Sequence, residues 1–336
     1  MRLIRYTPDK AVVWDSFVTA SRNGTFLFKR GYMDYHSDRF TDHSLMAYDG
    51  RGRLIALLPA SADGNTLSSH AGLTYGGWVT STEHCGQAVM LDIFDALRNY
   101  MSANDFKELI YKPVPPIYHR YPAEDDIYAL FRQGAVMDGC MTSATIPLDS
   151  PLLISGNNRR DAAKARREGL TVDATTSDAT LEEYWKILTD RLREAHDATP
   201  VHTLDEIRLL HSRFPGNIYL LSARSPEGEM EGGMLLYIAP PVIHTQYIAT
   251  TEYGRRYNCN ALILTALYDT LTDERREREN VIDITSIDIA SDTPLRYIDF
   301  GTSCQDWGHI LNIPLATQKE RLGGRTTLYT RYRLSL

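Results

Sequence analysis

The chain has 336 residues, of which 43% are hydrophobic and 24% charged, a composition typical of a globular protein of about two domains. Its net charge of −7 argues against a protein that coats nucleic acid, although a local basic patch is compatible with it. Four scattered cysteines show no zinc-ligand spacing, the N-terminus lacks an apolar signal segment, and no run approaches about 18 apolar residues, so we expect a cytoplasmic protein without a metal or a membrane span.

The first half of the chain predicts a strand-rich domain with two main helices. Alternating residues in SLMAYD and LIALLPAS, joined by a Gly-Arg-Gly turn, indicate a hairpin, and TLSSHAGLTYGGWV continues the strands. Apolar residues at helical spacing predict a helix over residues 87–102. The strand ELIYKPV, a helix within PAEDDIYALFRQGA and a strand within CMTSATIPL complete the order strand, strand, strand, helix, strand, helix, strand.

The second half repeats that order after three further helices. The basic segment NNRRDAAKARRE is one of them, and residues 181–195 and 204–214 are the others. NIYLLSAR, GGMLLYIA and VIHTQYIAT predict three antiparallel strands, and an apolar helix follows. Either VIDITSIDI or RYIDFG is the next strand, and TTLYTRYRLSL is the last. We therefore expect two similar α/β domains, residues 1–152 and 153–336, with a ligand cleft between them.

The stretch Ile243–Leu271 is the most informative, because it passes from a strand through a polar turn into an apolar helix. The turn holds Arg255 and Arg256, and Asn258 and Asn260 are placed to cap the helix. A helix start beside arginines is suited to a phosphate or diphosphate. The alternative is an ordinary strand–turn–helix with a solvated basic turn.

At this point the sequence resembles a known group. The segments NNRRDAAKARREGL, TPVHTLDEIRLLHSRFPGNIYLL, YIDFGTS and TQKERLGGRTTLYTRYRL, and in the first half LLPAS, SSHAGLTYGGWV and YKPVPPIYHRYPAEDDIYALF, are similar to FemAB-like proteins of the GNAT (acyl-CoA N-acyltransferase) superfamily. The FemABX family adds amino acids to peptidoglycan precursors. The resemblance implies an α/β (α+β) fold of two tandem GNAT-like domains, each a mixed, mostly antiparallel sheet flanked by helices.

The resemblance also implies a place for the acyl donor. The GNAT diphosphate loop, Gln/Arg-x-x-Gly-x-Gly/Ala, aligns with Arg256 to Ala261, with Cys259 where the first glycine is expected. A side chain there would hinder close approach of a diphosphate, which brings CoA binding into question and is compatible with aminoacyl-tRNA as donor. The residues expected to bind acetyl-CoA or another acyl-CoA are Thr250, Thr251, Tyr253, Arg255, Arg256, Asn258, Asn260 and Ala261.

N-acyl transfer needs a neutral amine, a proton acceptor and stabilisation of an oxyanion, and no metal. His202 and His196, in a turn around Pro200, are the candidate bases, with a surface or helix-capping role as the alternative. Tyr247, one register step from His244, could protonate the leaving thiolate or alcohol, and a core tyrosine is the alternative.

In the first half, a second group of residues is expected to bind the acceptor. It lies around the glycine-rich end of a strand and the segments after it, and comprises His70, Tyr75, Lys112 and Tyr118. For the glycines beside them, turn geometry alone is the alternative explanation.

Three functions follow from these patterns. The first is a FemAB-like N-acyltransferase acting on an amino group of a small molecule, peptide or peptidoglycan precursor. The second keeps this chemistry but takes aminoacyl-tRNA as donor, with the basic helix as tRNA contact. The third is a non-catalytic ligand-binding protein with the same fold.

Overall fold

The computed structural model describes residues 1–272 and 293–336. The predicted strand Val281–Ile289 lies outside the described residues. Contacts divide the chain into two compact units, which are Met1–Ser143 with Thr302–Asn312 and Thr327–Leu336, and Ala144–Gly301 with Ile313–Thr326. The expected single boundary after residue 152 differs from this division, because the C-terminal strand returns to the first unit.

The first unit is built on two groups of strands. In one, β1 (Arg2–Arg5), β3 (Leu45–Tyr48), β4 (Leu54–Leu58) and β7 (Val79–Thr80) follow each other as antiparallel neighbours. The other has the order β17 (Arg325–Ser335), β8 (Glu108–Tyr111), β6 (Thr66–Ser68), β5 (Ser61–Asp63) and β2 (Thr41–Asp42), in which only β6 and β8 run parallel. The predicted hairpin is confirmed as β3–β4.

Helices α3 (Gln87–Ala103) and α4 (Asp125–Arg132) pack together in the first unit, and α1 (Ala11–Ala20) and α2 (Arg30–Met33) lie between β1 and β2 in the chain. The buried face of α3 carries Met90, Ile93, Phe94 and Leu97, the spacing that predicted this helix. Strand β9 (Val136–Pro147) begins in the first unit and ends in the second. The short strands β15 (Cys304–Gln305) and β16 (Ile310–Leu311) pair with each other.

The second unit has a sheet with the order β10 (Thr171–Asp173), β11 (Ile218–Arg224), β12 (Met230–Ala239), β13 (Val242–Thr250), β14 (Tyr297–Thr302) and β9. The three predicted antiparallel strands are confirmed as β11, β12 and β13, whereas β13 and β14 run parallel. Of the two candidate strands, RYIDFG forms most of β14 and lies beside β13, whereas VIDITSIDI falls outside the described residues.

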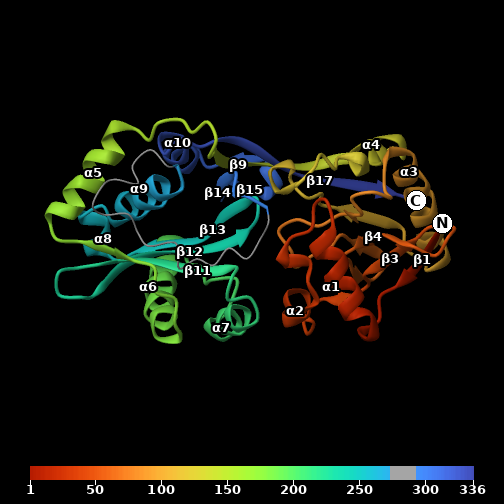
Figure 1. Ribbon diagram of the computed structural model, residues 1–336, viewed down its shortest axis with the longest axis horizontal. Helices are drawn as coiled ribbons and strands as arrows, with labels where there is room; N and C mark the ends of the chain where they lie inside the picture. Colours follow the sequence, from red (N-terminus) through yellow and green to blue (C-terminus); the bar gives the residue numbers. More distant parts are fainter. Residues whose placement is uncertain (273–292) are drawn as a thin grey trace. The chain divides into compact units, whose positions relative to one another are not determined.

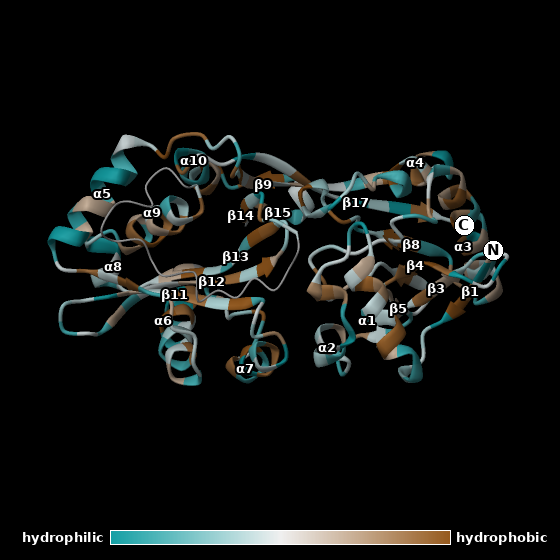
Figure 2. Cartoon of the chain, in the orientation of Figure 1, coloured by the Kyte–Doolittle hydropathy of each residue, from teal (hydrophilic) through white to brown (hydrophobic). Residues whose placement is uncertain are grey.

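Helices cover both faces of this sheet. Helices α5 (Gly156–Arg167) and α9 (Cys259–Leu271) pack on one face, and α6 (Asp178–His196) and α7 (Leu204–Arg213) on the other (Figure 1). Helix α8 (Glu252–Arg256) joins β13 to α9, and α10 (Ile313–Arg321) completes the unit. Apolar side chains of β11, β12, β13 and α9 form the core between them, whereas α5 is largely hydrophilic (Figure 2).

Local sequence explains where these helices begin. Thr203 and Glu206 form a capping box at the start of α7, and Ser177 with Thr180 does the same for α6. Within residues 1–272 and 293–336, no helix is both long and apolar enough to cross a membrane.

Candidate functional site

Strand β13 has two irregularities that shape the site. Its ladder with β12 pairs Leu235 with Tyr247 but Leu236 with Thr245, so Gln246 is an extra residue that forms a β-bulge. Its parallel ladder with β14 covers only Val242 to His244, and no described strand pairs with that side of β13 beyond His244. Within residues 1–272 and 293–336, the edge of β13 toward Thr250 therefore carries backbone groups that no strand covers and that can pair with a ligand.

The turn after β13 is held by a cap and a close backbone contact. The Thr251 hydroxyl accepts a hydrogen bond from the Gly254 N–H at 2.9 Å and donates one to the Glu231 carboxylate. A Cβ on Gly254 would lie 2.0 Å from the Glu231 carbonyl oxygen, so only glycine fits there. This packing seats α8 against β12 and directs the chain into α9.

Two expectations about this turn are wrong. Asn258 precedes α9 in the left-handed conformation (φ 62°) and makes no side-chain cap, and Asn260 lies within the helix, so neither caps it. Cys259 is fully buried in the core, where burial raises its pKa to about 12. Its side chain points into the protein, and therefore does not hinder a diphosphate at the helix start.

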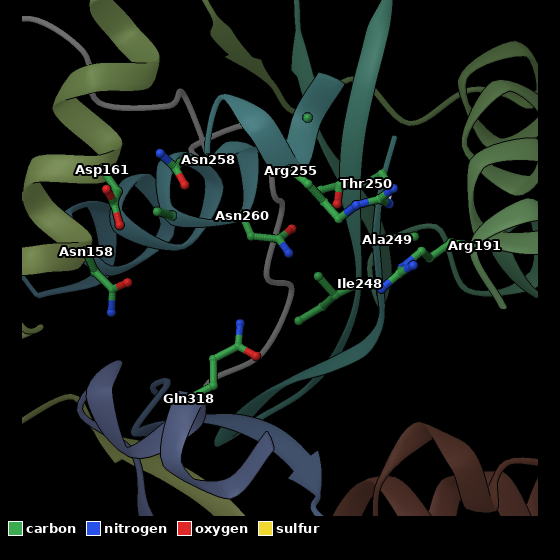
Figure 3. A pocket seen from close by; sticks show the side chains of 12 residues that line it. Asn158, Asp161, Arg191, Ile248, Ala249, Thr250, Arg255, Asn258, Asn260 and Gln318 are labelled. Carbon is green, nitrogen blue, oxygen red and sulfur yellow. Dashed lines mark hydrogen bonds between the residues drawn. The ribbon is translucent and has the colours of Figure 1, made fainter. Parts of the chain in front are cut away.

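A pocket of about 430 Å³ lies over this turn (Figure 3). Five of the residues expected to bind the donor line it, namely Thr250, Arg255, Asn258, Asn260 and Ala261. Thr251, Tyr253 and Arg256 do not. Tyr253 packs on Tyr257 with ring centroids 4.4 Å apart, and the Arg256 guanidinium lies over the same Tyr257 ring at 5.6 Å.

The pocket also has walls that local sequence did not predict. Asn158 and Asp161 come from α5, Arg191 from α6 and Gln318 from α10, while Ile248, Ala249 and Gly254 belong to the strand and turn already considered. Figure 3 shows Asp161 and Arg191 on opposite sides, with Asn260 between them. Only tertiary packing brings these helices together, so no local signal identified them.

Three polar groups of the pocket have no recorded partner within the described residues. Arg191 is half-buried and Asp161 is half-buried, and neither forms an ion pair there. The Oδ1 atom of Asn260 is buried without a hydrogen-bond partner in the described chain. Arg255 donates to the Thr250 carbonyl oxygen at 3.1 Å. The pocket therefore offers two cations, a carboxylate and an amide oxygen to a ligand.

The structure brings two predicted catalytic residues together. The Tyr247 hydroxyl lies 2.8 Å from Nδ1 of His202 and accepts from the His202 backbone N–H at 3.4 Å. His202 is buried, and the ring of Trp185 packs edge-on against Tyr247. Burial raises the pKa of Tyr247, which keeps its hydroxyl protonated at neutral pH. Their catalytic roles stay a prediction. His196 is the last residue of α6, and its side chain lies outside the described part of the structure.

A second hydrogen-bonded pair lies where the β13–β14 ladder ends. Nδ1 of His244 is 2.8 Å from Oδ2 of Asp299, and the two residues are register partners. Asp299 is fully buried and also accepts from the Thr145 hydroxyl at 3.3 Å.

The expected acceptor-binding residues are buried in the first unit. Tyr75 and Tyr118 pack with ring centroids 4.6 Å apart, and the Tyr118 hydroxyl lies 3.2 Å from that of Tyr329. Lys112 donates to the carbonyl oxygens of Leu73 and Ala71, and burial lowers its pKa to about 8. Burial likewise lowers the pKa of His70 to about 3. These contacts give each residue a structural role, and acceptor binding by them stays a prediction.

The basic residues of helix α5 differ in their exposure and in their partners. Arg159 forms an ion pair with Asp269 at 3.0 Å, and Arg166 is half-buried. Arg160, Lys164 and Arg167 are exposed at positions i, i+4 and i+7, which places them along one side of the helix. This row adjoins the turn of α5 that carries the pocket residue Asp161.

No protein-family model matches the sequence, and no curated protein sequence matches it. Among solved structures, FemX is similar over 100% of this chain and 98% of its own, with 11% identity and a TM-score of 0.67. L-PGS from Bacillus licheniformis matches over 98% of this chain and 92% of its own, with 13% identity and a TM-score of 0.61. A tandem GNAT protein from the clavulanic acid biosynthesis pathway matches over 99% and 98%, with 12% identity and a TM-score of 0.51. These similarities concern the fold, and they confirm the expected tandem GNAT-like α/β architecture.

Proposed function

We propose that this chain is an N-acyltransferase whose second unit holds the acyl donor in the pocket beside β13 and α9. The observation that carries this proposal is the combination of a helix start, two cationic side chains and a strand edge that no described strand covers, around one cavity. The N–H groups of the first turn of α9, with Arg191 and Arg255, suit the diphosphate of an acyl-CoA. The edge of β13 suits the amides of the pantetheine arm, which can pair with it as a strand does.

The proposed reaction uses the edge of β13 and Tyr247, which precedes the pocket residue Ile248 on the same strand. A neutral amine of a peptide, a small molecule or a peptidoglycan precursor attacks the thioester carbonyl, and a backbone N–H of β13 stabilises the oxyanion. The carbon–sulfur bond then breaks, and the protonated hydroxyl of Tyr247 donates to the leaving thiolate. The fold seen in FemX, a GNAT protein and L-PGS supports this chemistry by analogy only.

A transfer assay tests the proposal. The full chain is incubated with acetyl-CoA and with longer acyl-CoAs against a panel of amines, and free CoA and acylated amine are both quantified. We expect release of CoA in equal amount to the amide formed. Absence of binding to every acyl-CoA by calorimetry, together with absence of transfer, would overturn the CoA-dependent function.

The exposed row on α5 favours a second donor, aminoacyl-tRNA. Arg160, Lys164 and Arg167 form a basic edge beside the pocket wall that carries Asp161. A tRNA acceptor stem along this edge would place its 3′ end at the pocket. Replacing these three residues by Gln is expected to weaken tRNA binding. It should also reduce the slope of log K against log salt concentration by about two to three.

A matched triple variant controls for total charge. Arg51, Lys107 and Arg132 are exposed cations of the first unit, and their replacement by Gln removes the same charge elsewhere. The tRNA proposal expects this variant to bind tRNA as the wild type does. An equal loss of tRNA affinity in both triple variants would show that tRNA binds by non-specific charge attraction, and it would count against aminoacyl-tRNA as the donor.

A further inference from the structure

The β-bulge at Gln246 gives β13 an unusual distribution of side chains. In a regular strand, residues three apart point to opposite faces. Here Tyr247 pairs with Leu235 and His244 pairs with Tyr237, and these partners on β12 are two residues apart. His244 and Tyr247 therefore share one face of the sheet, the face that carries α6 and α7. Bulges commonly re-aim side chains in this way beside active sites.

The side chain of His244 is held in one orientation. Its Nδ1 lies 2.8 Å from the carboxylate of Asp299, which is itself fully buried and bonded to Thr145. Gly301 flanks the ring, because a Cβ at that position would lie 3.2 Å from Cε1 of His244. A carboxylate on one ring nitrogen keeps the proton there and leaves the lone pair of Nε2 for another partner.

His244 is also partly exposed to solvent, at the end of the β13–β14 ladder. Its side chain is 16% exposed, whereas the carboxyl group that orients it belongs to a residue with no exposed surface. It is the last residue of the β13–β14 ladder, so it lies where the edge of β13 that no described strand covers begins. Among the described residues, titratable groups near His244 include its register partner Tyr237 and Lys319, which donates to the Gly301 carbonyl oxygen at 2.8 Å. His202 and Tyr247 lie on the same face, and the His202 ring packs against both Tyr237 and Tyr247.

We propose that His244 is the general base of the transfer reaction and that Asp299 is its positioning residue. This inference rests on the proposed N-acyltransferase function. Nε2 of His244 accepts a proton from the acceptor nitrogen as that nitrogen forms its bond to the thioester carbonyl carbon. When the tetrahedral intermediate collapses, the electron pair of the carbon–sulfur bond leaves with sulfur, and Tyr247 protonates the thiolate. His244 then releases its proton to solvent, and the Tyr247 phenolate takes up a proton from solvent, so both residues return to their starting states.

His244 suits this role better than His202. His202 is buried and its Nδ1 lies within hydrogen-bond distance of Tyr247, an arrangement that positions the tyrosine. This face of the sheet then carries a base and an acid three residues apart. The base, His244, is positioned by Asp299, and the acid, Tyr247, is positioned by His202.

The test compares His244→Gln, His244→Ala and Asp299→Asn with His211→Gln. His211 is a half-buried histidine of the same unit whose Nδ1 lies 3.2 Å from the Ile218 carbonyl oxygen, so it controls for loss of a histidine as such. Each variant is measured for acyl-CoA affinity by calorimetry, thermal unfolding, and kcat and kcat/KM against pH.

We expect His244→Gln to lower kcat about 10²- to 10⁴-fold with unchanged donor affinity, and to remove the acid limb of the pH profile. Added imidazole should restore part of the activity of His244→Ala, and Asp299→Asn should shift the acid limb. Wild-type kcat and an unchanged profile in His244→Gln would overturn the inference while leaving the proposed function intact. A loss of donor affinity or folding in His244→Gln that accounts for the whole loss of rate would also overturn it. Absence of transfer by the wild type would overturn the proposed function itself.

Discussion

Arg191→Ala is expected to weaken acyl-CoA binding without unfolding the second unit. Arg191 reaches the pocket from α6 and has no recorded ion pair within the described residues, so its removal leaves no buried charge unpaired. A hydrogen bond to a charged group contributes about 1.5–3 kcal/mol. Because Arg191 is half-buried and partly screened by solvent, we take the lower end, about 1.5 kcal/mol, which corresponds to about a tenfold rise in Kd.

The control for this experiment lies on the same helix. Arg193 forms only a surface ion pair with Asp190 at 3.7 Å, with both side chains more than half exposed. Arg193→Ala should leave the Kd unchanged and alter stability by less than about 0.5 kcal/mol. Calorimetry with acetyl-CoA at low and at moderate ionic strength measures the Kd of both variants. The loss of affinity of Arg191→Ala relative to the wild type should become smaller at the higher ionic strength, because salt screens the charge. Equal affinity of Arg191→Ala and wild type at low salt would refute the assignment of Arg191 as a phosphate contact.

Three further predictions concern single residues. Asp161→Asn should tighten acyl-CoA binding by a few-fold, because it removes an unpaired carboxylate from an anion site, and weaker binding in calorimetry would contradict this. Gly254→Ala should lower the melting temperature and donor affinity together, since the added Cβ would lie 2.0 Å from the Glu231 carbonyl oxygen; a variant with unchanged Tm would show that this contact relaxes freely. Burial raises the pKa of Asp126 to about 7, so the stability that this carboxyl group contributes is full below the unfolded-state pKa near 4 and is lost as pH rises through 7. Asp126→Asn should therefore gain in free energy of unfolding relative to the wild type from pH 4 to 7, by at most about 1.4 kcal/mol per pH unit, and a pH-independent difference in urea denaturation would argue against a raised pKa.

The strand–turn–helix from β13 to α9 could be predicted because its signals are local. Alternation in VIHTQYIAT and the apolar run after Asn260 correspond directly to β13 and to the buried face of α9. The arginines of the turn predicted an anion site, and Arg255 lines the pocket, while anion binding there stays a prediction.

The bulge at Gln246 could not be predicted, because no glycine or proline marks it. Without it, His244 and Tyr247 would point to opposite faces, so strand alternation alone does not predict that they share one. The expected hindrance by Cys259 was also wrong. A motif specifies residue types but not the direction of a side chain on a helix, and the side chain of Cys259 faces the core.

Non-local packing accounts for the remaining differences. Arg191 and Asp161 become neighbours of one pocket only when α6 and α5 pack near α9 and β13. The final strand β17 pairs with β8, more than two hundred residues earlier in the chain, as Tyr332 opposite Tyr111 shows. Pairings at such separation leave no local pattern, and the division of the chain into units depends on them.

The most direct test of the account is a crystal structure of the full chain with acetyl-CoA. We expect electron density for the diphosphate of acetyl-CoA at the turn from Thr251 to Ala261, with the acyl end along the edge of β13 toward His244. Density for the diphosphate at any other place, or an empty turn at an acetyl-CoA concentration that saturates the protein in solution, would contradict it.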